Sequence, residues 1–183
     1  MMQGLWKCVV VSFLFIFFSP IAHSLEAEQS KESVMNNDKM DEVIRRLDDK
    51  AEGENGYWVF KIATLSVTVV TDEKADRMRI IIPIIESEKL DEATLYRVMQ
   101  ANFDSALDAR YAIAKNILWS AYIHPLASLN EEQFITAIGQ TVNLVSSFGT
   151  TYSSGLLSFR GGDSRAIQQK ELIQELLDKG RSI

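Results

Sequence analysis

Apolar positions along this chain change period several times, and each change predicts a different element. The first regular stripe recurs at intervals of three and four residues, which is typical of an amphipathic helix. Its members are Met40, Val43, Ile44, Leu47 and Ala51. Gly53 and Gly56 follow and end the pattern. Packing on the chain's own sheet is the favoured use of this stripe, and binding of a partner is the alternative.

Three segments rich in aromatic and β-branched side chains come next, and this composition favours strands. They are residues 57–62, 65–71 and 77–85. The charged residues 72–76 predict a turn before the third strand. That strand is apolar almost throughout from Met78 to Ile85, which predicts burial on both faces, or helices over one face and a partner over the other. Pro83 cannot donate to a ladder, so we expect an edge or a bulge there.

One helix start occurs twice in the sequence. Asp91 and Asn130 are strong N-cap residues, because their side-chain oxygens accept from backbone N–H groups that the first turn leaves unpaired. Each is flanked by an apolar pair with the spacing of a hydrophobic staple. These starts predict a central helix from Glu92 to about Leu107 and a long helix from Glu131 to Phe148. The predicted buried positions of the central helix are Leu95, Val98, Met99, Phe103 and Ala106.

Between the two helices, residues 110–114 and 117–123 predict a hairpin with Lys115 and Asn116 at its turn. After the hinge at Gly161 and Gly162, residues 167–179 repeat the amphipathic helical pattern. The predicted order is therefore α-βββ-α-ββ-α plus a C-terminal helix. Short turns between consecutive strands imply an antiparallel sheet packed by helices, which is an α+β fold.

Residues 1–24 have the features of a cleaved export signal. Lys7 precedes an apolar run from Cys8 to Phe18, and small residues precede a cleavage point after Ser24. The run is shorter than the roughly 20 residues that cross a membrane comfortably; an uncleaved anchor is the alternative. We therefore predict a signal peptide at 1–24, a flexible leader at 25–38, an α+β domain at 39–160 and a C-terminal amphipathic helix at 161–183.

This organisation places the mature protein in the periplasm or outside the cell. The periplasm is favoured, because cleavage removes Cys8, the only cysteine, and no disulfide is then possible. The formal net charge of −6 becomes one unit more negative when Lys7 is lost. Such a balance disfavours nucleic acid and anionic membrane surfaces as partners, and no membrane contact is expected after cleavage.

Residues that carry chemistry are scarce. With His23 in the signal, His124 is the remaining histidine, whereas a metal site needs several converging ligands. The hydroxyls of Ser153 and Ser154 lack a motif with a neighbouring base. The paired carboxylates, such as Asp48 with Asp49, are sequence neighbours on helices and point in different directions. We therefore predict no catalytic, cofactor-binding or metal-binding residue.

Aromatic and aliphatic side chains remain as candidates for binding. Trp119 and Tyr122 are three residues apart on a predicted strand, so they face opposite sides of the sheet. Core packing under the helices is the favoured interpretation for Trp119. The candidate partner-binding surface consists of Trp119, Tyr122, Ile167, Leu172, Ile173 and Leu176.

Four segments together resemble the class I type III secretion chaperones (the Tir-chaperone group) and their YbjN-like relatives. They are residues 77–83, residues 98–103 with an asparagine near the end of the central helix, the hairpin 112–123 and the start of the closing helix at 129–134. The resemblance implies a non-enzymatic domain, often a homodimer, that binds extended segments of other proteins. Those chaperones act in the cytoplasm, whereas this chain carries an export signal, so only the fold and a protein-binding surface are expected here.

The first hypothesis is therefore an exported, non-enzymatic protein-binding module that forms a homodimer and binds an unidentified protein. The alternative is a carrier or sensor of a small apolar ligand, held in a pocket between the sheet and the long helix. Its basis is the apolar density of residues 78–85 and 134–148. An enzyme ranks third.

Overall fold

The computed structural model describes residues 34–155 and 164–181, with only the backbone described for residues 164–170. The predicted signal peptide and most of the predicted leader lie outside these residues. The elements, in chain order, are α1 (Asn37–Leu47), β1 (Glu52–Glu54), β2 (Tyr57–Ile62), β3 (Leu65–Asp72), β4 (Arg77–Glu86), the 3-10 turn η1 (Ser87–Lys89), α2 (Glu92–Asp104), β5 (Arg110–Ala114), β6 (Ile117–His124), α3 (Glu131–Ser146) and α4 (Ser164–Arg181).

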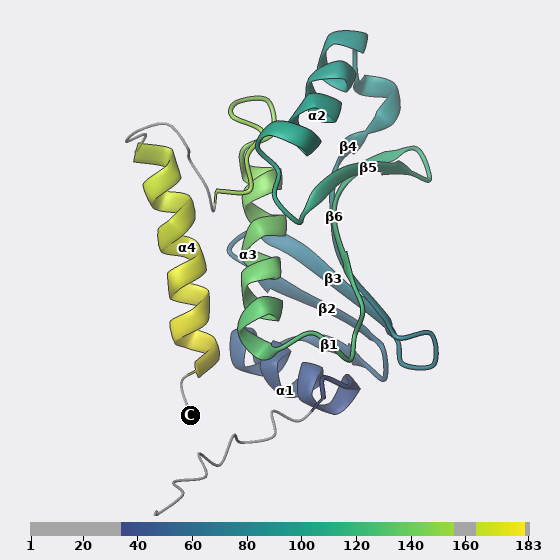
Figure 1. Ribbon diagram of the computed structural model, residues 1–183, viewed down its shortest axis with the longest axis vertical. Coiled ribbons are helices and arrows are strands. Elements are labelled where there is room, and N and C mark those ends of the chain that lie inside the picture. The colour runs from purple at the N-terminus through teal and green to yellow at the C-terminus, as the bar shows by residue number, and fades with distance from the viewer. Residues whose placement is uncertain (1–33, 156–163, 182–183) are drawn as a thin grey trace, which may run out of the picture. The chain divides into compact units, whose positions relative to one another are not determined.

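The strands form one antiparallel sheet in the order β1-β2-β3-β4-β6-β5 (Figure 1). The predicted α+β class and the order of its elements are confirmed. Strands β4 and β6 are neighbours although α2 and β5 separate them in the sequence. The short strand β1 was not predicted, because its three residues are all exposed and carry no apolar signal. Its Gly53 has φ +98°, and a Cβ there would lie 2.2 Å from the carbonyl oxygen of Tyr57.

Burial alternates along the central strands, so the sheet has one face covered by helices and one face without them. The covered face carries Trp58, Phe60, Val69, Ile80 and Tyr122, all buried. Figure 1 shows α1 and α3 on this side of the sheet, and contacts of α3 with β3, β4, β5 and β6 agree. The apolar run of β4 is thus buried on one face only.

Pro83 lies where the sheet is irregular, as the sequence predicted. The register between β4 and β6 shifts between Pro83 and Ile85, which marks a bulge. Pro83 also lies beyond the part of β4 that pairs with β3, since that pairing ends at Ile81. The missing N–H of the proline therefore breaks no ladder on that side.

Both predicted helix caps are present. Asn130 and Gln133 form a capping box. The backbone N–H of Gln133 donates to Asn130 Oδ1 at 2.8 Å, and the backbone N–H of Asn130 donates to Gln133 Oε1 at 3.1 Å. Asp91 accepts from the backbone N–H of Thr94 at 2.7 Å. Helix α1 begins at Asn37, with Asn36 as its cap, slightly before the predicted end of the leader at Asp38.

Helix α4 is part of the main core. Its Ile173, Leu176 and Leu177 are buried, and glycines let it approach its neighbours closely. A Cβ at Gly139 of α3 would lie 2.5 Å from Cγ1 of Ile173, and one at Gly180 would lie 2.3 Å from Cδ1 of Ile135. These approaches explain why α4 packs on α3, which the sequence pattern of α4 alone did not indicate.

Polar contacts also join α4 to α1, the first described helix. The Arg46 guanidinium donates to the carbonyl oxygen of Gly180 at 2.6 Å, and Lys179 donates to the carbonyl oxygen of Leu47 at 2.5 Å. Arg46 also forms an ion pair with Glu131 at the start of α3. Three helices that are distant in the sequence are thus fixed together at one end.

Candidate functional site

Helix α2 exposes a continuous apolar stripe. Phe103 is 93% exposed, Tyr96 67%, Met99 48% and Leu95 39%. These four residues, which we call the outer stripe, follow one another at intervals of one, three and four positions and so lie on one side of the helix. The prediction that Leu95, Met99 and Phe103 are buried is wrong, because α2 packs through its other side, where Val98 and Ala101 are buried.

The inner side of α2 buries few residues, but hydrogen bonds attach it to the sheet. The side chain of Asn102 donates to the carbonyl oxygen of Tyr111 at 3.0 Å and accepts from the N–H of Tyr111 at 2.7 Å. This pair of bonds joins the end of α2 to the edge strand β5. The Arg97 guanidinium lies over the ring of Tyr152, 5.0 Å from its centroid, which adds a cation–π contact. The outer stripe is therefore carried by a fixed helix.

Beneath α2 lies a second apolar cluster, separate from the main core. Tyr111, Phe148 and Tyr152 are its aromatic members, with ring centroids 5.7–6.2 Å apart in tilted and edge-on arrangements. The Tyr111 hydroxyl donates to the carbonyl oxygen of Leu144 at 2.8 Å. Burial raises the pKa of this hydroxyl well above its ordinary value, so it stays neutral. The cluster supports α2 from beneath.

Opposite the helices, the sheet presents a face that no described helix covers. We call this surface the open face. Its cross-strand neighbours form rows: Tyr57, Val70, Arg79 and Ile123 in one row, and Val59, Thr68, Ile81 and Ala121 in the next. A groove of about 650 Å³ runs over this face. The open face is thus a mixed apolar and charged surface on a regular sheet.

Trp119 belongs to the open face and lines the groove, whereas core packing under the helices was the favoured interpretation of the sequence. The residue is half-buried, and its indole N–H donates to the carbonyl oxygen of Ala114 at 2.9 Å. Tyr122 points to the opposite, covered face, as the three-residue spacing predicted, and it is buried there although it was a candidate for partner binding. Only Trp119 of this pair is therefore accessible from the open face.

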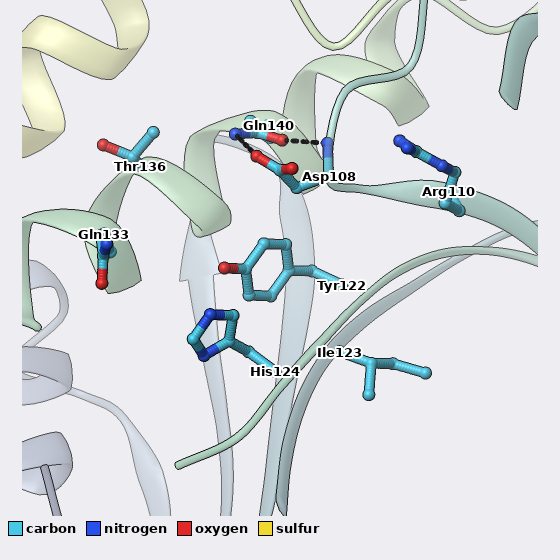
Figure 2. A pocket seen from close by; sticks show the side chains of 8 residues that line it. All are labelled: Asp108, Arg110, Tyr122, Ile123, His124, Gln133, Thr136 and Gln140. Carbon is cyan, nitrogen blue, oxygen red and sulfur yellow. Dashed lines mark hydrogen bonds between the residues drawn. The ribbon is translucent and has the colours of Figure 1, made fainter. Parts of the chain in front are cut away.

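A polar pocket of about 430 Å³ lies between β6 and α3 (Figure 2). The ring of Tyr122 stacks on His124 with 5.9 Å between centroids and 11° between planes. The Gln140 side chain accepts from the backbone N–H groups of Asp108 and Ala109 and donates to the Asp108 carboxylate at 3.1 Å. Burial, and the nearby Asp108 carboxylate, raise the pKa of Tyr122.

This pocket occupies the place that the sequence suggested for an apolar ligand, but its lining is different. Eight residues line the pocket, and two of them are the aromatic Tyr122 and the aliphatic Ile123. The other six have polar or charged side chains: Asp108, Arg110, His124, Gln133, Thr136 and Gln140. Apolar ligands gain affinity from burial against apolar walls, and this pocket offers few of them. The apolar side chains of α3 are instead packed in the core.

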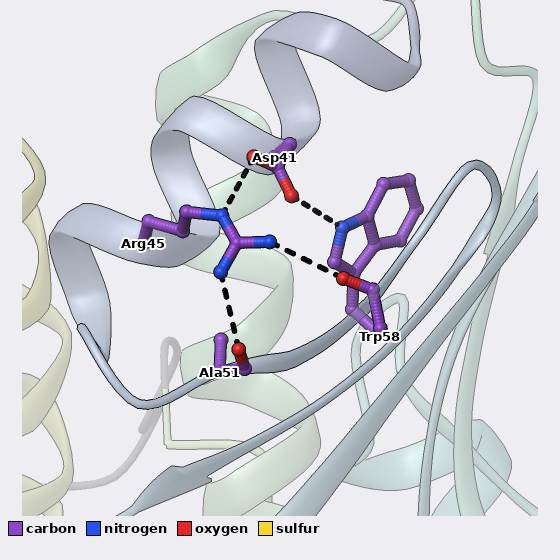
Figure 3. A network of polar contacts seen from close by, with 5 residues as sticks. Asp41, Arg45, Ala51 and Trp58 are labelled. Carbon is purple, nitrogen blue, oxygen red and sulfur yellow. Dashed lines mark hydrogen bonds and ion pairs between the residues drawn. The ribbon is translucent and has the colours of Figure 1, made fainter.

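A connected set of polar contacts lies between α1 and the β1–β2 hairpin (Figure 3). The Asp41 carboxylate accepts from Arg45 Nε at 2.7 Å and from Trp58 Nε1 at 2.8 Å. Arg45 also donates to the carbonyl oxygens of Ala51 and Gly53. The bond from Arg45, aided by that from Trp58 and opposed by burial, lowers the pKa of the Asp41 carboxyl. All these groups satisfy one another, which is typical of a structural network.

Among the described residues, no group of three or more His, Cys, Asp or Glu side chains is arranged to hold a metal ion. Within the same residues no helix is both long and apolar enough to cross a membrane. His124 lies at the end of β6, where its Nδ1 is 2.7 Å from the carbonyl oxygen of Pro125. That contact gives the ring a local structural partner.

The predicted partner-binding residues do not come together on one surface. Ile173 faces α3 in the same chain, Ile173 and Leu176 are both buried in the main core, and Leu172 packs against that core. Tyr122 is buried on the covered face, and Trp119 lies on the open face. The side chain of Ile167 is outside the described residues. An exposed apolar surface lies instead on α2. The sequence signal that could have found it is a second set of apolar residues at helical spacing on that helix.

No protein-family model matches this chain, and no curated protein sequence matches it. Among solved structures, the chain is similar to one in the HopA1-SchA chaperone–effector complex, with 10% identity and a TM-score of 0.44 over 52% of this chain and 77% of that one. It is also similar to the Yersinia pestis type III secretion chaperone SycH, solved in complex with a stable fragment of YscM2, with 13% identity and a TM-score of 0.44 over 58% of this chain and 97% of that one. Both solved structures are complexes of a chaperone, and the second chaperone belongs to the type III secretion class that the sequence resembles.

Proposed function

We propose that this protein is an exported, non-enzymatic protein-binding module that forms a homodimer through the outer stripe of α2. The observation that carries the proposal is the exposure of four large apolar side chains on one side of a short, fixed helix. Single exposed apolar residues are common, whereas a contiguous apolar patch is typical of an interaction site.

A second copy of the chain is the occupant that suits this stripe. The stripe has aromatic and methionine side chains, which are enriched in protein interfaces, and no charged residue among its four members. Two such helices packed side by side across a two-fold axis bury equivalent stripes against each other. The dimer then leaves the open face of each sheet free for a different protein.

Oligomeric state tests this proposal directly. We expect light scattering coupled to size-exclusion chromatography to give a dimer for the wild-type chain and a monomer for Phe103→Asp, since a charge in an apolar interface loses its hydration without gaining a partner. Ile123→Asp is the matched control, because Ile123 is an exposed apolar residue on the open face, and this variant should remain a dimer. A wild-type monomer at high protein concentration, or a dimer that persists in Phe103→Asp, would overturn the proposal.

Export rests on the sequence of residues 1–24 and has its own test. The full chain is expressed in a Gram-negative host, the periplasmic fraction is collected and the N-terminus of the protein is determined. We expect periplasmic protein that begins at Leu25. Protein that keeps Met1 and stays in the cytoplasm would contradict export, and uncleaved protein in the membrane fraction would favour an anchor.

The alternative function, a carrier of a small apolar ligand, receives less support. The pocket between β6 and α3 is polar, and the apolar residues behind it are already packed. We therefore retain protein binding as the proposed function.

A further inference from the structure

We infer that the open face binds an extended, acidic segment of another protein that also carries bulky apolar side chains. This inference deepens the proposed function by giving the chemistry of the partner, and it rests on the proposal that the protein binds proteins. Three observations on the groove of the open face carry it: its charge, its apolar floor and the spacing of its cations.

The groove concentrates positive charge on an acidic chain. Arg77, Arg79 and Lys115 line it, all exposed, while the whole chain has a formal net charge of −6. Among the described residues, none of these three side chains takes part in an ion pair. Asp72 is the acidic residue of the lining, and its carboxylate accepts from the backbone N–H of Ala75. The local excess of cations favours an anionic partner.

Apolar side chains lie directly beside these cations. Arg79 stands between Val70 on β3 and Ile123 on β6, its cross-strand neighbours, and Ile81 follows two positions later on β4. Ile123 is 62% exposed, and Trp119 closes the groove toward the β5–β6 turn. A partner that offers only negative charge would leave this apolar floor in water. The surface therefore fits a segment with both acidic and apolar side chains.

The cations have the spacing of an extended chain. Arg77 and Arg79 are alternate residues of one strand, so their Cα atoms are about 6.6 Å apart along it. Acidic side chains at alternate positions of an extended segment have the same separation and project from one side of it. Isolated surface ion pairs contribute little affinity but fix register and discriminate between partners. The apolar residues then provide the burial, and the arginines select the acidic segment.

An acidic protein segment is favoured over an anionic membrane. The net negative charge of the whole chain opposes approach to a broad anionic surface, whereas a single segment contacts only the groove.

A selection from a random displayed peptide library tests the inference, with the purified wild-type protein as bait. We expect enrichment of peptides with acidic residues at alternate positions together with aromatic or aliphatic residues. Enrichment of basic or neutral peptides, or none above a surface without protein, would overturn the inference.

Charge reversal then locates the binding site of the enriched peptides. We expect Arg79→Glu to weaken binding at least tenfold, measured by fluorescence anisotropy of a labelled peptide at low salt, and high salt to weaken wild-type binding. Lys61→Glu is the matched control, because Lys61 is an exposed cation on the same face and outside the groove lining; its binding should change less than threefold. Equal weakening by both variants would show a diffuse charge effect and contradict a groove site.

Three further measurements separate this inference from the proposed function and from other occupants. Phe103→Asp should bind the peptides as the wild type does even if it becomes monomeric, so a failure of dimerisation and a failure of the groove are distinct results. If Arg79→Glu itself abolishes a wild-type dimer, the open face is a contact between copies and the inference is wrong. Vesicles that contain phosphatidylserine should not compete with the peptide; competition that is lost in Arg79→Glu would identify a membrane surface instead.

Discussion

Helices α2 and α3 begin with the same local signals and end in different environments. Both have a capped first turn, acidic residues near the N-terminus and a staple-like apolar pair. Helix α3 lies between the sheet and α4 and buries ten residues, whereas α2 buries only Val98 and Ala101. The comparison teaches that capping reports where a helix begins, while its burial depends on partners that are distant in the sequence. The proposed function rests on the second property, because α2 is the helix whose exposed side is apolar.

The largest contrast is expected between two phenylalanines. Phe134 of α3 is fully buried and Phe103 of α2 is 93% exposed. Phe134→Ala should lower the free energy of unfolding by roughly 3–5 kcal/mol, because it leaves a cavity in the core. Phe103→Ala should change it by less than about 0.5 kcal/mol. Urea denaturation at low protein concentration, where association contributes little, measures both.

Similar losses for the two variants would break the comparison, since they would mean that Phe103 is buried in the folded chain. Far-ultraviolet circular dichroism of each variant before denaturation shows whether it is folded, so an unfolded Phe134→Ala protein would count as the extreme of the expected loss.

A smaller effect is expected where α2 is attached to the sheet. Asn102→Ala removes both bonds to the backbone of Tyr111 and leaves two peptide groups without these partners. We expect a loss of roughly 1–3 kcal/mol in the free energy of unfolding. Gln100→Ala, at an exposed position of the same helix, is the control and should be close to neutral. If Asn102→Ala is equally neutral, α2 is held by its apolar contacts alone.

The smallest expected effect is a pH dependence of stability that the Asp91 cap of α2 contributes and the Asn130 cap of α3 does not. Asp91 has a lowered pKa in the folded chain, because Thr94 donates hydrogen bonds to its carboxylate from its side chain and backbone. Its stabilising contribution is therefore present above the ordinary Asp pKa of about 3.9 and is lost as the pH falls through the lower folded value. Asn130 caps α3 and does not titrate in this range.

Asp91→Asn should keep the cap at neutral pH and remove this part of the acid sensitivity. Unfolding measured from about pH 5 downward for the wild type and the variant gives the difference. Asp41 and Asp48 also have lowered pKa values. Both residues are present in the wild type and in the variant, so their contributions cancel in the difference between the two unfolding curves. A difference that is constant with pH would contradict the role of the Asp91 carboxylate.

The sequence predicted the elements whose signals are local. Strand limits, both caps, the irregularity at Pro83 and the hairpin turn at Lys115 and Asn116 are encoded by neighbouring residues. These two turn residues have φ of +51° and +59°, the conformation that a two-residue hairpin turn requires. Such features can be read from a short stretch of chain.

Burial could not be predicted in the same way. Helix α2 has apolar residues on two sides, and periodicity alone does not say which side meets the sheet. The answer depends on Asn102 and on the edge strand β5. Likewise, the attachment of α4 depends on Gly139 and Gly180, whose importance is visible only once Ile173 and Ile135 are seen beside them. The candidate surfaces were therefore missed on α2 and predicted only in part, through Trp119, on the sheet.

The contacts between α1 and α4 have a consequence for biosynthesis. Arg46 and the Gly180 carbonyl that it binds are 134 positions apart in the chain. At translation rates of about 5–20 residues per second, the second partner is made roughly 7–27 seconds after the first. Until then the apolar stripe of α1 lacks part of its cover, so the nascent chain passes through a long interval in which the first of the described helices to be made still waits for its last partner.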